Sequence, residues 1–126
     1  MIERNGNSRD LNGLRALVAE DDFHIAFVIE TALEAAGIEV VDTVSRVDEG
    51  LKIARSEKPD IAVVDIRLGE SSSYPLVRQL RDAGTKVVLA TGTEPNSHME
   101  IELSGIPVVR KPYTVEQLID AIRNIV

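Results

Sequence analysis

The chain contains no cysteine and no tryptophan, and aromatic residues make up only 3% of its 126 residues. Without cysteine, disulfides and thiolate catalysis are excluded, which fits a reducing compartment. No apolar run approaches the roughly 20 residues that a bilayer requires, and the polar first residues do not resemble a signal peptide. We therefore expect a cytoplasmic protein that makes no contact with a membrane.

Positive charge is also scarce. Fourteen Lys and Arg residues stand against 21 Asp and Glu residues, which gives a formal net charge of −7 at pH 7. Contacts with the phosphates of a nucleic acid need clustered basic residues, and here they are scattered, so we expect no direct nucleic-acid binding. With 44% hydrophobic residues, the chain is long enough for one domain with a real core and too short for two.

The first thirteen residues lack hydrophobic periodicity, so we interpret 1–13 as a flexible arm and 14–126 as the domain. Short apolar runs then alternate with stretches of helical periodicity. The expected strands are 14–19, 38–44, 60–66, 85–90 and 108–109, and the expected helices are 23–36, 45–58, 74–83 and 114–126. Three helix starts carry capping signals, namely Asp22, Ser45 with Asp48, and Thr114 with Gln117.

Strict alternation of strands and helices predicts an α/β fold, with a doubly wound parallel five-stranded sheet and right-handed crossovers. The stretch 92–105 has room for one more helix. It contains Pro95 and little apolar material, so any helix there is expected to be short and poorly anchored.

One carboxylate, Asp65, interrupts the apolar run Ile61–Leu68 (IAVVDIRL) just where a buried strand should end. A bare carboxylate in that place lowers stability unless something binds it, which favours a functional role. Polar residues also follow the other expected strands: Glu20, Asp21 and Asp22 the first, Thr91 the fourth, and Lys111 the fifth. Because ligands bind beyond the carboxyl ends of the strands in such sheets, these residues are candidates for a single site.

Neighbouring carboxylates repel one another, which raises at least one pKa unless a cation neutralises them. Oxygen ligands at an open, water-accessible edge suit Mg²⁺. A metal ion, a lysine and a hydroxyl are the recurring equipment of phosphoryl transfer, and an aspartate can itself be the nucleophile and form an acyl phosphate. The pattern therefore predicts a pocket for a phosphoryl group, with Mg²⁺ as the cofactor and Asp65 as the acceptor.

The segments VAEDD, VVDIRL, LATG and RKPY resemble the four signature segments of response-regulator receiver domains, and their order matches. The separation between Asp21 and Asp65, 65 − 21 = 44 positions, is typical of that family. The resemblance implies a flavodoxin-like (βα)5 fold with strand order 2-1-3-4-5 and a role in a two-component phosphorelay.

The resemblance also implies a role for each site residue. Asp65 would accept the phosphoryl group from a sensor histidine kinase or a histidine phosphotransferase. Asp21 would bind Mg²⁺ directly, Glu20 would bind it through water, and the carbonyl of Arg67 would be a further ligand. Thr91 and Lys111 would contact the phosphoryl group, with Gly92 leaving it approachable. The Lys111–Pro112 bond would be cis, and the side chains of Arg67 and Thr93 would tune hydrolysis of the acyl phosphate.

Two departures from the family pattern matter. Val108 stands where the family usually has an aromatic switch residue, which puts the usual coupling to the threonine in question. The segment LATG partly matches a subgroup of stand-alone receivers called FAT GUY regulators. Because no output domain follows the last expected helix, we expect the signal to pass to a downstream protein at the face of helix 4, strand 5 and helix 5.

Two alternatives stay open. The chain could be a pseudo-receiver that binds partners without phosphorylation, or a receiver fragment of a hybrid kinase. An aspartate-nucleophile phosphatase would need a second aspartate where Arg67 stands, so we expect no enzymatic activity beyond self-catalysed phosphorylation and dephosphorylation. Phe23 and Tyr113 are interpreted as packing residues, and His24 and His98 as exposed ones.

Overall fold

The computed structural model describes residues 10–92 and 105–126. In chain order the described elements are β1 (Arg15–Ala19), α1 (Phe23–Ala35), β2 (Glu39–Val44), α2 (Val47–Glu57), β3 (Ile61–Val64), β4 (Arg67–Leu68), β5 (Ser71–Ser72), α3 (Tyr74–Asp82), β6 (Lys86–Thr91), β7 (Val108–Arg110) and α5 (Val115–Ile125). The prediction of a further helix within 92–105 lies outside the described residues, apart from the two glycines at its ends. None of the helices in the described ranges is long and apolar enough to cross a membrane.

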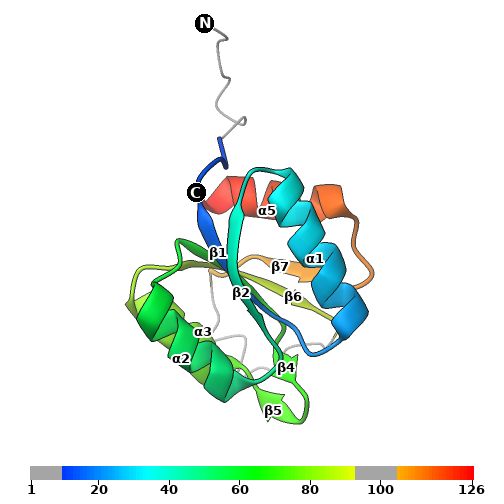
Figure 1. Cartoon of the computed structure of the whole chain (residues 1–126). Coiled ribbons are helices and arrows are strands. Elements are labelled where there is room, and N and C mark those ends of the chain that lie inside the picture. The colour runs from blue at the N-terminus through cyan, green and yellow to red at the C-terminus, as the bar shows by residue number, and fades with distance from the viewer. Residues whose placement is uncertain (1–9, 93–104) are drawn as a thin grey trace, which may run out of the picture.

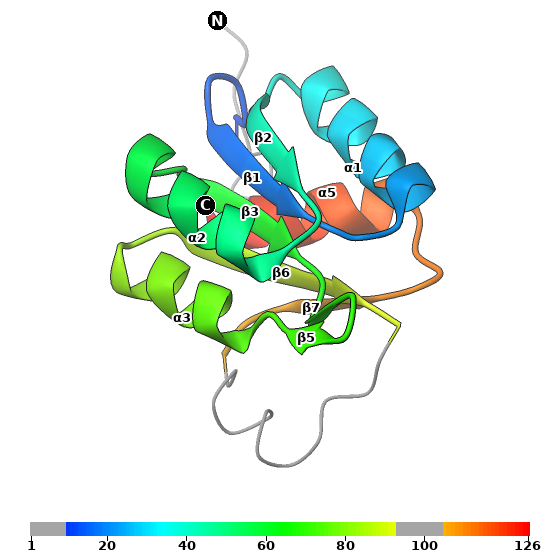
Figure 2. The ribbon, with the colours of Figure 1, turned by 60° about the horizontal axis from the view of Figure 1, so that its bottom comes forward.

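Five parallel strands form the main sheet in the order β2-β1-β3-β6-β7. This order is the predicted 2-1-3-4-5 once the short strands β4 and β5 are set aside, so the flavodoxin-like topology is confirmed. Helices α1 and α5 cover one face of the sheet, and α2 and α3 cover the other (Figures 1 and 2). Strand order reverses between β1 and β3, and a ligand is expected at the carboxyl ends of these two strands.

The core has two layers because successive strand residues point to opposite faces of the sheet. On β1, Ala16 and Val18 pack toward α1 and α5, whereas Leu17 and Ala19 pack toward α2 and α3. All four are at most 1% exposed. Both faces of the central strands β1 and β3 are therefore apolar apart from Arg15 at the start of β1, and the buried acids Glu20 and Asp65 come just past the strand ends.

The N-terminal boundary differs from the prediction. Leu11 was assigned to the flexible arm, yet it is 3% exposed and belongs to the core cluster under α1 and α5. The amide of Gly13 donates to the carbonyl oxygen of Gly37 over 3.0 Å. Within the described residues, packing of the domain therefore begins at Leu11, and residues 1–9 lie outside the described part of the chain.

Helix α1 buries less of its surface than its periodicity predicts. Phe23 was expected to pack, but it is 79% exposed; Phe27 is 63% exposed and Val28 50%. The buried stripe of the helix is narrower, consisting of Ala26, Ile29, Ala32 and Leu33. The helix therefore presents a large apolar surface to solvent.

Two of the three predicted helix caps are present. Asp22 accepts from the amide of Ile25, and Thr114 forms a complete capping box with Gln117. The predicted box at Ser45 is wrong, because α2 has Arg46 as its N-cap and no side-chain cap bond. The segment between β3 and α3, to which the sequence assigns no element, contains β4 and β5, which pair as an antiparallel hairpin.

Candidate functional site

Backbone hydrogen bonds between neighbouring strands continue one residue past the ends of β1 and β3, and they position the first residues of the site. The amide of Asp65 donates to the carbonyl of Ala19, and the amide of Glu20 donates to the carbonyl of Val44, both over 2.9 Å. These bonds hold Glu20 and Asp65 side by side on neighbouring strands. Both are buried, at 3% and 7% exposure, although each carries a carboxylate.

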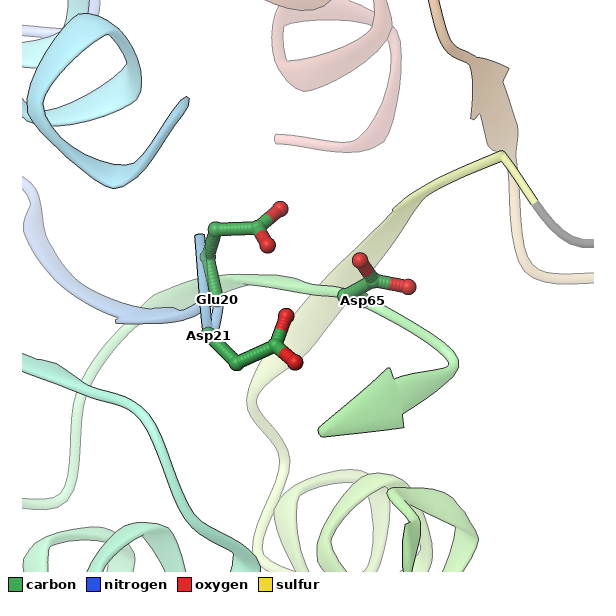
Figure 3. A group of neighbouring side chains, drawn as sticks. All are labelled: Glu20, Asp21 and Asp65. Carbon is green, nitrogen blue, oxygen red and sulfur yellow. The ribbon is translucent and has the colours of Figure 1, made fainter. Parts of the chain in front are cut away.

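Three carboxylates converge at this edge of the sheet. One oxygen from each of Glu20, Asp21 and Asp65 lies within 4.8 Å of the others. Figure 3 shows the side chains of Glu20 and Asp21 extending from the end of β1 toward the side on which Asp65 lies. Asp21 is the most exposed of the three, so the cluster opens toward solvent on its side.

Lys111, just after β7, supplies the opposite charge. Its Nζ donates to Glu20 Oε1 and to Asp65 Oδ2, in both cases over 2.7 Å. Burial lowers the pKa of Lys111, but the bonds to Asp65 and Glu20 together outweigh burial and raise the pKa above its ordinary value. The lysine is therefore a fixed positive charge between two acids. The Lys111–Pro112 bond that precedes the turn into α5 is cis, as predicted.

The pKa values of the two acids after β1 shift in opposite directions. Burial raises the pKa of Glu20, in spite of its bonds to Lys111 and to the amide of Asp22. The pKa of Asp21 is lowered, mainly because the amide of Gly69 donates to Asp21 Oδ2 over 2.8 Å. The site therefore disfavours the ionised form of Glu20 and favours the ionised form of Asp21.

Thr91 ends β6, next to the lysine. It is 1% exposed, and its carbonyl accepts from the amide of Lys111 over 3.0 Å. A Cβ added to Gly92 would lie 3.7 Å from Lys111 Cβ, so even the smallest side chain there would contact the lysine stem. The structure thus brings Thr91 and Lys111 to the same edge as the acids. Thr93 lies outside the described residues.

The β4–β5 hairpin contacts the acids of the site through its backbone amides, which the sequence does not predict. The amide of Arg67 donates to Asp65 Oδ1 over 3.2 Å, and the guanidinium donates to the carbonyl of Glu70 over 2.8 Å. The sequence signal that could have predicted this hairpin is Gly69 followed by Glu70, since Gly at the first of two turn residues favours a type II′ hairpin. That Arg67 offers its carbonyl to a metal ion stays a prediction.

The donor set fits Mg²⁺. All its side-chain ligands are carboxylate oxygens, the type that Mg²⁺ prefers, and octahedral ligands at about 2.1 Å lie roughly 3–4.2 Å from one another. The spread of 4.8 Å among the oxygens of Glu20, Asp21 and Asp65 needs only a small contraction to reach that range. The lowered pKa of Asp21 also keeps one ligand ionised.

Two expectations about individual side chains are confirmed. Tyr113 packs against the core under α1 and α5, and burial raises the pKa of its hydroxyl. His24 is exposed and meets the ring of Phe23 edge to face. His98 lies outside the described residues.

Comparison with known proteins gives the family. The model of the response regulator receiver domain matches residues 16–123. The probable transcriptional regulator ycf27 of Porphyra purpurea is 29% identical over 114 residues, which cover 88% of this chain and 46% of that protein. This chain therefore spans about half the length of that relative.

Solved structures show the same fold. A response regulator receiver protein from Sinorhizobium medicae superposes with a TM-score of 0.80 at 23% identity, covering 89% of this chain and 93% of that one. A response regulator from Burkholderia pseudomallei with a phosphorylated aspartic acid, a calcium ion and citrate has a TM-score of 0.76 at 27% identity. The match covers 86% of this chain and 65% of that one. With the family model spanning most of the domain, the chain belongs to the response regulator receiver domain family.

Proposed function

We propose that this receiver domain accepts a phosphoryl group on Asp65 from a phosphohistidine and signals through protein–protein contacts. The observation that carries the proposal is the position of Lys111 Nζ, which lies 2.7 Å from both Glu20 Oε1 and Asp65 Oδ2 at an edge of three carboxylates. The relative from Burkholderia pseudomallei, which carries a phosphorylated aspartic acid, supports it.

The transfer needs one carboxylate oxygen of Asp65 to attack phosphorus as the N–P bond to the donor imidazole breaks. A C–O–P linkage forms, and the departing imidazole nitrogen keeps the electron pair of the broken N–P bond and takes a proton from water. The phosphoryl oxygens bring negative charge to a place where Lys111 already holds Asp65. The lysine would then pair with a phosphoryl oxygen, and the hydroxyl of Thr91, at the neighbouring strand end, would donate a hydrogen bond to another.

Glu20, Asp21 and Asp65 are the side chains that would hold Mg²⁺, together with the carbonyl of Arg67. When bound, the ion supplies positive charge that offsets the repulsion between these carboxylates and the incoming phosphoryl oxygens. The residues of the chain do the positioning: Lys111 orients Asp65, and the backbone bonds to Ala19 and Val44 hold Asp65 and Glu20.

The exposed apolar surface of α1 supports a protein as the phosphodonor. Phe23 and Phe27 border a depression of about 590 Å³ that Glu20 and Asp21 also line, so a partner docked there would reach the site. We assign this surface to a histidine kinase or a histidine phosphotransferase, and we propose that the protein works in the cytoplasm with such donors. Output would use the face of β7 and α5, together with the segment 93–104 that lies outside the described residues.

Phosphorylation is tested by incubation with acetyl phosphate and Mg²⁺ followed by intact mass measurement. We expect a gain of one phosphoryl group in the wild type and none in Asp65→Asn. Asp82→Asn, at the exposed end of α3, is the matched control and should gain the group like the wild type. Absence of the gain in the wild type would instead favour a pseudo-receiver.

Docking is tested separately with Phe27→Asp. We expect slower phosphorylation from a phosphorylated histidine phosphotransferase and an unchanged rate from acetyl phosphate, because the small donor needs no docking surface. Equal slowing with both donors would mean that the substitution disturbs the site, and no slowing with either would place docking elsewhere.

A further inference from the structure

The β4–β5 hairpin reaches two of the three carboxylates at once. The amide of Arg67, at its base, donates to Asp65 Oδ1, and the amide of Gly69, at its tip, donates to Asp21 Oδ2. The tip bond is the shorter, at 2.8 Å against 3.2 Å, and joins residues 48 positions apart in sequence. A surface turn therefore holds a side chain of the acidic cluster.

The hairpin is itself fixed on both sides. At its base, the amide of Ser73 donates to the carbonyl of Ile66 over 2.7 Å, which closes the loop. Across the turn, the guanidinium of Arg67 donates to the carbonyl of Glu70 over 2.8 Å. The Gly69 N–H is thus presented from an anchored turn.

Asp21 needs such a support more than its neighbours. Glu20 and Asp65 are buried and share the ammonium of Lys111, whereas Asp21 is exposed at the end of β1. A carboxylate has about four lone-pair sites, so one N–H bond to Oδ2 restricts the rotation of the side chain and still leaves sites for a metal ion. Supports of this kind typically change metal affinity 10- to 100-fold when they are removed.

We propose that Gly69 is a positioning residue for the metal site: its N–H, held by the β4–β5 hairpin, fixes Asp21 and thereby raises the affinity of the domain for Mg²⁺. This inference rests on the proposed function, since it assumes that the three acids bind Mg²⁺. It goes further in assigning a role to a turn that contributes no side-chain ligand.

A substitution at Gly69 can be matched to a control. Gly69 has φ +64°, and Gly84, between α3 and β6 at the opposite edge of the sheet, has φ +89°. A Cβ would meet nothing within 4 Å at either position, so alanine brings backbone strain at both sites without a clash. Alanine keeps the backbone N–H at both positions, so the two variants share the strain and differ in whether relief of that strain would turn an N–H away from Asp21.

The test is a titration of the ¹⁵N-labelled protein with MgCl₂, followed by NMR. We expect Gly69→Ala to raise the Kd for Mg²⁺ about 10-fold and Gly84→Ala to leave it within about twofold of the wild type. Urea midpoints should fall by similar amounts in both variants. A Kd for Gly69→Ala within twofold of the wild type would overturn the proposal.

A second measurement does not depend on how Gly69→Ala folds. In the wild type, the Gly69 amide proton should resonate downfield and exchange slowly with solvent, and Asp21→Asn should weaken both properties. An unchanged Gly69 amide in Asp21→Asn would contradict the inference. The proposed function fails by a different result, namely a wild type that binds Mg²⁺ but gains no mass from acetyl phosphate.

Discussion

Lys111 Nζ donates to Asp65 Oδ2 over 2.7 Å, and this bond joins the edge strand β7 to the central strand β3 across the end of the sheet. The same ammonium lies 2.7 Å from Glu20 Oε1. One cation thus compensates two buried acids. Any group that arrives at Asp65 must either bring positive charge or share that ammonium.

Removing the ammonium should destabilise the domain, and Mg²⁺ should restore part of the loss. Breaking a buried ion pair costs about 3–5 kcal/mol; because this edge opens to solvent, we expect Lys111→Met to lower the free energy of unfolding by about 1–3 kcal/mol. Urea denaturation with and without Mg²⁺ measures both effects, with Lys52→Met on the exposed face of α2 as the control. Equal Mg²⁺ stabilisation of the two variants would count against an acidic metal site.

Glu20→Gln should have the opposite effect on the metal-free domain. Because burial raises the pKa of Glu20, ionisation of this carboxyl destabilises the folded state at pH values above 4.5, its ordinary value. Glutamine removes the charge but has one acceptor oxygen in place of two, so it keeps the bond from Lys111 or the bond from the amide of Asp22 and loses the other, which offsets part of the gain. At pH 7 in EDTA we expect stability to rise by up to about 1 kcal/mol, and the stabilisation by Mg²⁺ to shrink. A clear loss of stability in EDTA would contradict this account.

The sequence predicts the sheet and its polar edge because both follow from simple periodicities. Apolar runs predict the parallel sheet through the alternation rule, whereas its strand order comes from the family resemblance. The strand-end rule brings Asp65 and Lys111 together, as the structure has them. The β4–β5 hairpin escapes prediction because it is short, lacks a hydrophobic period and contacts the acids through backbone amides, which any residue but proline carries. The exposure of Phe23 could not be predicted from the sequence either. Periodicity shows which residues of a helix are apolar, but it does not show how wide a face of the helix the neighbouring elements cover.

Two similar capping signals in the sequence have different outcomes, and this difference predicts different energies. Thr114 accepts from the amide of Gln117 over 3.0 Å, whereas Ser45 makes no cap bond to α2. We expect Thr114→Ala to lower the free energy of unfolding by about 1 kcal/mol and Ser45→Ala to change it by less than about 0.5 kcal/mol. Thermal or urea unfolding of the two variants and the wild type measures these losses. Equal losses of stability in Thr114→Ala and Ser45→Ala would contradict the assigned caps.

The loss of folding stability at acid pH should depend on Asp21. Its pKa is lowered by the bond from Gly69, so its contribution to stability is fully present above about pH 4 and is lost as pH falls through the lower pKa of the folded state. In EDTA, the wild type should therefore exceed Asp21→Asn in stability at pH 5–7 and converge with it below about pH 3. Urea midpoints measured across this range test the sign. A difference that grows toward acid pH would contradict a lowered pKa.

The last prediction concerns Gly50, at the contact between α2 and α3. An ideal Cβ at Gly50 would lie 2.6 Å from Leu76 Cδ2, and Leu76 is fully buried. Alanine gains about 1 kcal/mol in helix propensity over glycine, but overpacking a core typically costs about 1–3 kcal/mol. The steric term wins, so we expect Gly50→Ala to lower the free energy of unfolding by about 1 kcal/mol.

A double-mutant cycle isolates the contact. Leu76→Val removes the two Cδ atoms that crowd the new methyl group, so in that background Gly50→Ala should be neutral or stabilising. Unfolding free energies of the four proteins give the coupling between the two positions. The same loss from Gly50→Ala in both backgrounds would mean that the helices accommodate the methyl group by moving apart, and that Leu76 does not require glycine at this position.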